Sequence, residues 1–369
     1  MPDASDAPPL GGPMVVELMG PAEGGIRTHV AELVSRLRGA GARVAVAGPR
    51  GALGDRGEVD WVVDVPAALS LRGLLAARRQ LARIPEVDVV HAHGLKAGWV
   101  AVTARPRRRV VLTAHNLVLG DAPKDRLLRR LERELVKRVD HLIAPSPAID
   151  RHVDGLLPPE RRTVIVPVFP PPRGGAARAA VRADLGAAPD QPLVVVVARL
   201  HPQKGLHTFV EAWARVAAAV PGAAAVVVGE GPSRDELQSD IDRRGLTASL
   251  RLVGARQPAI APMEAADVVA LSSEWEAIPL VVAEAALLGT PVVTTDVGIV
   301  AEVITNGSTG FVVDVGDAAG LAEGLITLLE DPGRAAVAGA RLGEEAARRF
   351  DPDALTAAVR SVYAEVAGR

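Results

Sequence analysis

The sequence predicts an α/β protein made of two doubly wound, parallel-sheet domains of Rossmann-like type. Short valine-rich segments alternate with segments rich in alanine, leucine and arginine from residue 14 onwards. The alternation stops in a stretch rich in proline, glycine and arginine (residues 167–178) and then starts again. Continuous apolar strands separated by helices are typical of a parallel sheet covered on both faces. The length of 369 residues suits two domains of about 150–200 residues each.

The first half of the chain predicts six strands, each a short apolar run. They lie at residues 14–19, 43–47, 87–91, 110–113, 141–144 and 163–166. Helices fit between them at residues 25–38, 71–83, 96–104, 124–139 and 147–155. We therefore expect one parallel-sheet domain at residues 14–170, preceded by a disordered tail at residues 1–13.

The second half repeats the pattern and ends in helices. Its strands are predicted at residues 193–199, 225–229, 250–253, 268–271, 292–295 and 311–313. The last helices are predicted at residues 318–329, 333–350 and 354–367. We expect a linker at residues 171–190 and a second domain at residues 191–350. The C-terminal segment, residues 351–369, is expected to pack back on the first domain.

Composition and charge limit the class of protein. Cysteine is absent, which excludes disulfides and thiolate metal sites. The first residues have neither the positive region nor the apolar core of a secretory signal, so we expect a cytoplasmic protein. Residues 1–170 carry a net charge of +6, and residues 171–369 carry −8. A basic half beside an acidic half indicates different partners for the two halves.

Glu276 and Glu284 lie in a segment that reads as loop, helix, tight turn and strand (residues 272–295). Ligands of open α/β sheets bind beyond the carboxyl ends of the strands, and a helix N-terminus can hold a phosphate. Two carboxylates beside such an anion site suit a ligand with a phosphate and several hydroxyls, such as a nucleotide-sugar. The alternative is two surface carboxylates near a helix start. The apolar neighbours of Glu284 argue against it, because a buried carboxylate needs a partner.

Two cations and a glycine pair also stand where strands end. Arg199 follows a predicted strand and Lys204 precedes the next helix, so the pair could clamp a diphosphate. The alternative is two solvated loop cations. Gly24 and Gly25 open the first helix and permit close approach of backbone to a ligand, or they serve packing alone. Their surroundings do not match the G-x-G-x-x-G dinucleotide pattern.

The histidines gather in the first half. His91 and His93 could chelate a metal, but no carboxylate or third histidine lies near them in the sequence. We therefore predict no metal site. His115 follows the strand at residues 110–113, where it could bond a sugar hydroxyl or simply end the strand.

Taken together, these residues resemble the retaining glycosyltransferases of family 4. The resemblance spans nearly the whole chain, through DVVHAHG, VVLTAHN, VVVVARLHPQKGL, WEAIPLVVAEAALLGTPVV and TGFVVDVGD. It implies the GT-B fold, in which two Rossmann-like domains face each other across a cleft. Residues 14–170 would be the acceptor side, and residues 191–350 would bind the nucleotide-sugar donor. The family usually has glycine after the first glutamate, where this chain has Ala277.

The resemblance also implies roles for individual residues. Arg199 and Lys204 would neutralise the donor diphosphate, Glu284 would bind the ribose, and Glu276 and His115 would contact the transferred sugar. The implied catalytic set is Glu276, His115, Arg199 and Lys204. The implied donor-binding set is Gly24, Gly25, Arg199, Lys204, Glu276, Ala277, Ile278, Pro279, Leu280, Val281 and Glu284. No metal and no cofactor beyond the nucleotide-diphosphate sugar is expected.

The expected reaction is transfer of a hexose-type sugar to an acceptor hydroxyl with retention of configuration. The alternatives are a non-catalytic sugar-nucleotide-binding protein and a sugar-nucleotide epimerase on the same scaffold. The acceptor is expected to be a small molecule, a saccharide or a lipid-linked sugar, and no nucleic-acid partner is expected. A basic segment at residues 124–138, with Arg105 and residues 107–109, predicts either an ordinary amphipathic helix or peripheral contact with the inner face of a membrane.

Overall fold

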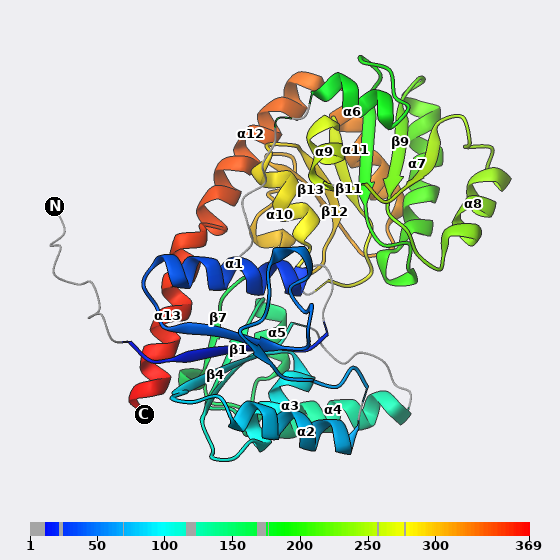
Figure 1. Cartoon of the computed structure of the whole chain (residues 1–369). Coiled ribbons are helices and arrows are strands. Elements are labelled where there is room, and N and C mark those ends of the chain that lie inside the picture. The colour runs from blue at the N-terminus through cyan, green and yellow to red at the C-terminus, as the bar shows by residue number, and fades with distance from the viewer. Residues whose placement is uncertain are drawn as a thin grey trace, which may run out of the picture. The chain divides into compact units, whose positions relative to one another are not determined.

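The computed structural model describes residues 12–21, 25–68, 70–115, 123–167, 175, 177–256, 258–276 and 278–369. The chain divides into two compact units (Figure 1). Unit 1 comprises Met1–Pro170 and Pro352–Arg369, and unit 2 comprises Pro171–Asp351. The last helix of the chain is therefore part of unit 1.

Unit 1 is built on a seven-stranded parallel sheet with the order β3-β2-β1-β4-β5-β6-β7. The strands are β1 (Val15–Met19), β2 (Val44–Gly48), β3 (Trp61–Val62), β4 (Val89–His93), β5 (Arg109–Thr113), β6 (His141–Ala144) and β7 (Arg162–Val164). The helices are α1 (Gly25–Gly39), α2 (Leu71–Ala82), α3 (Leu95–Thr103), α4 (Pro123–Val136), α5 (Pro147–His152) and α13 (Pro352–Gly368), with short 3-10 turns η1 (Gly54–Arg56) and η2 (Pro159–Arg161).

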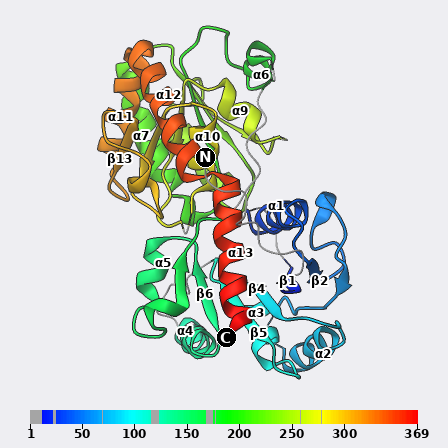
Figure 2. The ribbon, with the colours of Figure 1, turned by 90° about the vertical axis from the view of Figure 1, so that its left-hand side faces the viewer.

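Helix α13 covers the middle of the unit 1 sheet, beside α1 (Figure 2). Its apolar positions recur at helical spacing, and Val359, Val362, Tyr363 and Val366 are buried. They join one core cluster with Leu33 and the strand residues beneath. Helices α2 and α3 lie on the opposite face of this sheet (Figure 1). The two faces are thus covered by helices, as a parallel sheet requires.

Unit 2 is built on a six-stranded parallel sheet with the order β10-β9-β8-β11-β12-β13. The strands are β8 (Leu193–Val197), β9 (Ala224–Val228), β10 (Leu250–Gly254), β11 (Val268–Leu271), β12 (Val292–Thr295) and β13 (Gly310–Val313). The helices are α6 (Arg178–Asp184), α7 (Leu206–Ala219), α8 (Arg234–Arg243), α9 (Ile260–Ala265), α10 (Leu280–Leu287), α11 (Ala318–Glu330) and α12 (Pro332–Arg349), with 3-10 turns η3 (Pro202–Lys204) and η4 (Val300–Glu302). Trp213 and Phe209 of α7 fill the core between α7, α11 and the sheet.

The predicted fold class is confirmed, because both sheets are parallel and covered by helices. The strand predicted at residues 87–91 instead forms as β4, whose residues Val89–His93 pair with β1 and β5, so both histidines lie within it. Helix α6 lies inside the segment expected to be a linker. It is held to unit 2 by the buried side chain of Arg182, whose guanidinium donates to the carbonyls of Ala188, Ala265 and Gln191.

Strand order reverses once in each sheet, between β1 and β4 in unit 1 and between β8 and β11 in unit 2. Ligands of doubly wound sheets bind at such switch points, beyond the carboxyl ends of the strands. The loops after these four strands are therefore the places to look for a site. Within the described ranges, each helix is too short or too polar to cross a bilayer.

Candidate functional site

The switch point of unit 2 brings together the loops that follow β8 and β11. Gly205 has a φ of 56°, and a Cβ atom there would lie 2.0 Å from the carbonyl oxygen of Ser272. The Ser272 hydroxyl donates to the Lys204 carbonyl at 3.0 Å, and the Glu274 N–H donates to the Gln203 carbonyl at 2.9 Å. Only glycine permits this approach, so Gly205 lets the two loops form one surface.

Lys204 and Glu276 form an ion pair on that surface. The Ser273 hydroxyl donates to the same Glu276 oxygen at 2.9 Å and helps to fix the carboxylate. Both charged side chains are largely buried, with exposed fractions of 17% and 12%. The structure thus joins two residues that the sequence had placed on separate strand ends.

Glu284 lies in the second turn of α10, among buried residues that include Val282, Ala283 and Ala285. Among the described residues, none donates a hydrogen bond to its carboxylate. Burial raises the pKa of Glu284 to about 7. A mostly buried carboxyl without a donor has unused capacity to accept hydrogen bonds. This arrangement suits a ligand that brings hydroxyl donors.

Arg199 is exposed just beyond β8, and no described residue bonds its guanidinium. The loop that carries it packs on the Gly-Glu-Gly turn after β9. A Cβ atom on Gly229 would lie 1.8 Å from the Ala198 carbonyl oxygen, and one on Gly231 would lie 2.3 Å from that of Leu200. No role was predicted for this turn, although two glycines separated by one residue after a predicted strand were a usable signal.

The remaining predicted donor-binding residues fall into three groups. Ile278 is half-buried and Pro279 buried at the start of α10, where Leu280 and Val281 are partly exposed. Gly25 is the first residue of α1 in unit 1. Gly24 and Ala277 lie outside the described residues.

The switch point of unit 1 holds a buried network around Glu17 of β1. Its carboxylate accepts hydrogen bonds from the Tyr363 hydroxyl at 2.6 Å and from His93 Nε2 at 2.8 Å. His91 Nδ1 lies 3.0 Å from the same carboxylate and 2.6 Å from the Tyr363 oxygen. The other ring nitrogen of His91 lies 2.7 Å from the Thr113 hydroxyl. Three donors from β4 and α13 therefore converge on one carboxylate.

The electrostatics of this network fix the protonation of its members. Burial alone raises the pKa of Glu17, but His91 and His93 outweigh it and hold that pKa well below its ordinary value. Burial is also the main cause that lowers the pKa of His93 to about 4 and that of His115 well below 6.5. At neutral pH the carboxylate is therefore ionised, and His93 and His115 are neutral.

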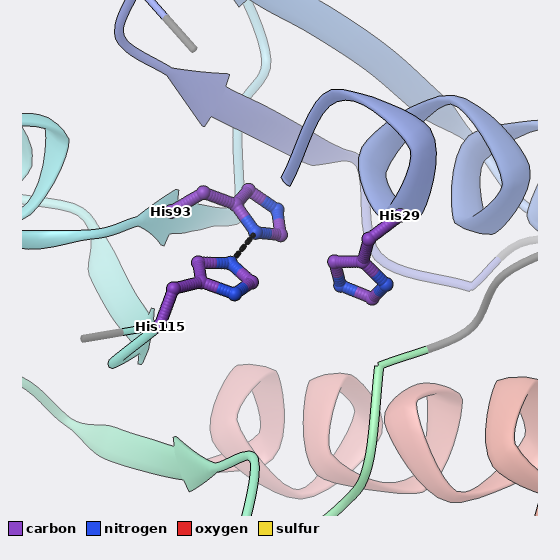
Figure 3. Close-up of side chains that lie close together, drawn as sticks. All are labelled: His29, His93 and His115. Atoms are coloured by element: carbon purple, nitrogen blue, oxygen red, sulfur yellow. Dashed lines mark hydrogen bonds between the residues drawn. The ribbon is translucent and has the colours of Figure 1, made fainter. Parts of the chain in front are cut away.

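The hydrogen bonds then show which ring nitrogens of His93 and His115 carry protons. Ionised Glu17 can only accept, so His93 Nε2 carries a proton and His93 Nδ1 is an acceptor. His115 Nε2 lies 3.0 Å from that Nδ1 and must be the donor. Figure 3 shows the two rings side by side, with His29 of α1 facing them. The ring centroid of His29 lies 5.4 Å from that of His93 and 5.5 Å from that of His115.

Sequence patterns singled out His91, His93 and His115 separately but did not predict that they meet Glu17, Tyr363 and His29, because these residues come from distant segments. His93 and Glu17 are 76 residues apart, and His93 and His115 are 22 apart. The prediction that no metal binds rested on the lack of a carboxylate or third histidine near His91 and His93. The structure supplies both in space, from β1, α1 and the end of β5.

Two parallel-sheet domains with charged side chains at the switch point of the second are compatible with a glycosyltransferase of GT-B fold, and the comparisons with known proteins identify that class. Residues 24–169 match the glycosyl transferase 4-like domain, and residues 177–349 match the glycosyl transferases group 1 family. The chain therefore belongs to the glycosyltransferases of family 4 type.

Several relatives are similar over most of the chain. The D-inositol 3-phosphate glycosyltransferase of Nocardia farcinica is 31% identical over 334 residues, which cover 83% of this chain and 72% of the relative. The glycogen synthase of Mycobacterium tuberculosis is 29% identical and covers 82% of this chain and 67% of its own. Among solved structures, Anabaena HepE in complex with UDP-glucose is 25% identical, with a TM-score of 0.81 over 95% of this chain and 100% of HepE.

Proposed function

We propose that this glycosyltransferase moves a hexose-type sugar from a nucleotide-diphosphate sugar to an acceptor hydroxyl, with retention of configuration. Unit 2 would hold the donor. The observation that carries the proposal is the Lys204–Glu276 pair at the switch point, with the unpartnered carboxyl of Glu284 on the adjoining helix. The complexes of HepE with UDP and UDP-glucose make a UDP-hexose the first donor to test.

The diphosphate would be neutralised by the protein's own cations. Arg199 is exposed and offers a bidentate fork, and Lys204 offers a point charge beside it. The N-terminus of α10 adds a partial positive charge. Positive groups fixed in place can stabilise a leaving diphosphate without a metal ion. We therefore propose that the transfer step needs no bound metal.

A bound donor would separate the Lys204–Glu276 pair. The ammonium would turn to the diphosphate, and the carboxylate would accept hydrogen bonds from hydroxyls of the transferred sugar. Ser273 holds one oxygen of Glu276 in place for this purpose. His115, which is neutral at physiological pH, would contact the sugar as a hydrogen-bonding group and not as a cation.

Glu284 would accept hydrogen bonds from the ribose hydroxyls. Its raised pKa means that the carboxyl is only partly ionised near neutral pH before the ligand binds. Two hydroxyl donors would favour the ionised form and lower that pKa again. The ribose hydroxyls would thereby become the hydrogen-bond donors that Glu284 lacks among the described residues.

The chemical step exchanges one bond at the anomeric carbon. The acceptor oxygen forms a bond to that carbon as the bond to the diphosphate oxygen breaks. The acceptor proton passes to the departing diphosphate on the same face of the sugar. Attack from that face keeps the anomeric configuration.

The first experiment compares the wild type with Glu276→Gln. Transfer should fall by at least tenfold, which corresponds to about 1.4 kcal/mol of barrier, and the affinity for free UDP should not fall. Wild-type transfer by this variant would remove Glu276 from the mechanism. Full activity in excess chelator is expected, and its complete loss would overturn the metal-independent step.

A second experiment separates transfer from the alternatives. Without an acceptor, the enzyme should hydrolyse the donor slowly, and NMR of the product should show the donor's anomeric configuration. An epimerised sugar-nucleotide would indicate an epimerase. Donor binding without turnover of any acceptor would indicate a binding protein. A thermal-shift assay with UDP-, GDP- and ADP-sugars shows which nucleotide base the donor carries, because the preferred donor stabilises the protein most.

The acceptor would be bound by unit 1 and would be a small molecule, a saccharide or a lipid-linked sugar. Leu135 of α4 is buried, but Leu127 is 55% exposed and neighbours the exposed Arg126 and Arg130. An exposed leucine among arginines suits peripheral contact with an anionic membrane. A soluble acceptor met in the cytoplasm remains our first proposal.

A further inference from the structure

We propose that His29, His93 and His115 bind one divalent transition-metal ion, with Zn²⁺ as the probe. Their ligand nitrogens all lie within 4.8 Å of one another. The three side chains are buried and come from three different elements, namely α1, β4 and the loop after β5. The site lies in unit 1 and includes His115, which the proposed function places against the transferred sugar. Ligation through Nε2 would leave the Nδ1–H of His115 for that contact.

The spacing of the three rings fits a single ion. Their centroids form a nearly equilateral triangle with sides of 5.3, 5.4 and 5.5 Å. A tetrahedral ion with metal–nitrogen distances of about 2.0–2.1 Å would hold three imidazole centroids about 5.2 Å apart. His93 Nδ1 and His115 Nε2 are already 3.0 Å apart, close to the roughly 3.3 Å between two ligands of such an ion. Small ring movements therefore suffice.

Glu17 bonds to the ring nitrogen of His93 that does not face the proposed ion. Histidine ligands commonly donate their second ring N–H to a carboxylate, which fixes the ring and makes the ligating nitrogen more basic. His93 Nε2 donates to Glu17 at 2.8 Å, so Nδ1 is the nitrogen that faces His115. Tyr363 and His91 hold the carboxylate in turn. The outer shell that such a site needs is thus already present.

The second candidate group, Glu17 with His91 and His93, does not fit an ion. Both nitrogens of His91 are engaged, one with Tyr363 and one with Thr113. The Glu17 carboxylate already accepts hydrogen bonds from Tyr363 and His93 and lies 3.0 Å from His91 Nδ1. An ion there would break the network, whereas an ion among the three histidines would replace the His93–His115 hydrogen bond and leave the hydrogen bonds to Glu17 in place.

Binding requires one proton to move. The proton on His115 Nε2 must pass to Nδ1 of the same ring, so that Nε2 can ligate. Three neutral nitrogens favour Zn²⁺ and its transition-metal neighbours over Mg²⁺ and Ca²⁺, which prefer oxygen ligands. The fourth position is left for water.

The direct experiment is a calorimetric titration of Zn²⁺ into the full chain, purified without a polyhistidine tag and stripped with chelator. One ion should bind per chain, and Mg²⁺ should not compete. His29→Gln and His115→Gln should each weaken binding by at least tenfold, and Glu17→Gln by about 10–100-fold. His152→Gln is the matched control, because His152 lies in unit 1 and is bonded to Glu132 away from the cluster. It should bind as the wild type does.

A second measurement distinguishes loss of the metal site from misfolding of a variant. Co²⁺ should give the strong visible absorption of a tetrahedral complex in the wild type and in His152→Gln. Variants that retain the wild-type circular dichroism but lose this absorption would support the site. Equal Zn²⁺ affinity in the wild type and a folded His29→Gln variant would overturn it, as would loss of binding in His152→Gln.

Discussion

Glu17 of unit 1 and Glu284 of unit 2 are both mostly buried glutamates, yet their pKa values move in opposite directions. Three side-chain donors surround Glu17, and its pKa falls well below the ordinary value. No described residue donates to Glu284, and its pKa rises to about 7. The difference comes from the partners and not from the burial. It fits a structural role for Glu17 and the ligand-binding role that we propose for Glu284.

The same contrast extends to the charged groups around each glutamate. In unit 1 the polar side chains at the switch point bond to one another and are almost inaccessible. In unit 2 the Lys204–Glu276 pair is partly exposed, and Arg199 is exposed. Unit 2 therefore leaves charged groups accessible at its switch point, whereas unit 1 encloses the neutral imidazoles of His93 and His115.

Replacing each glutamate by leucine tests whether the two carboxylates contribute differently to the free energy of unfolding. Glu17→Leu leaves buried donors without an acceptor and should lower the free energy of unfolding by about 3–5 kcal/mol. Glu284→Leu removes an unpaired carboxyl from an apolar setting and should leave that free energy unchanged or higher. Urea denaturation followed by circular dichroism measures both. Equal losses in the two variants would contradict the comparison.

Nucleotide affinity should depend on the charged residues at the switch point of unit 2. Glu284→Ala and Lys204→Ala should each weaken UDP binding by about 1–3 kcal/mol, since each removes one partner of a charged hydrogen bond. Arg348→Ala is a suitable control, because it removes an exposed ion pair with Glu345 on α12. Calorimetry that finds unchanged affinity in both site variants would end the donor-site assignment.

The raised pKa of Glu284 predicts a specific pH dependence. Between its ordinary value of 4.5 and about 7, the folded protein holds a proton that the unfolded chain has released. The free energy of unfolding of the wild type, relative to Glu284→Gln, should therefore fall as the pH rises through this window. Saturating UDP should reduce the fall, because its hydroxyls favour the ionised carboxyl. A flat difference between pH 4.5 and 7 would mean that Glu284 has a partner in solution.

The smallest effect expected is at a membrane surface. Each basic residue near an anionic bilayer contributes about 1 kcal/mol. If α4 makes this contact, vesicles with anionic lipid should sediment the protein at low salt and release it as the salt rises. The triple change Arg129→Glu, Arg130→Glu and Arg133→Glu should then weaken binding. Absence of binding at low salt would favour a soluble acceptor.

Two of the four arginines proposed beside α4 have a structural use. Arg109 pairs with Asp140 at 3.1 Å. Arg108 donates to the carbonyls of Leu81, Ala82 and Ile84, at and beyond the C-terminal end of α2. Arg105 and Arg107 remain exposed. A substitution of Arg108 would therefore test stability rather than membrane contact.

The sequence predicted the fold well, because strand and helix patterns are local. It also placed Glu276 and Glu284 correctly in the loop and helix after β11. It did not predict that Lys204 and Glu276 form an ion pair, which depends on the close approach at Gly205. The network around Glu17 was also missed, because Tyr363 lies 346 residues away. Contacts that depend on how distant segments pack leave no periodic signal in a single sequence.

The place of α13 in unit 1 has a consequence for biosynthesis. A ribosome makes unit 2 between the two pieces of unit 1. When residue 170 has been made, the sheet still lacks the helix that covers its middle, and Glu17 lacks the hydroxyl of Tyr363. Unit 2 is continuous and can complete its fold first. Part of the apolar face of the unit 1 sheet therefore stays uncovered until Pro352–Gly368 has left the exit tunnel, and we expect the first half of the chain to be the part that needs chaperone protection.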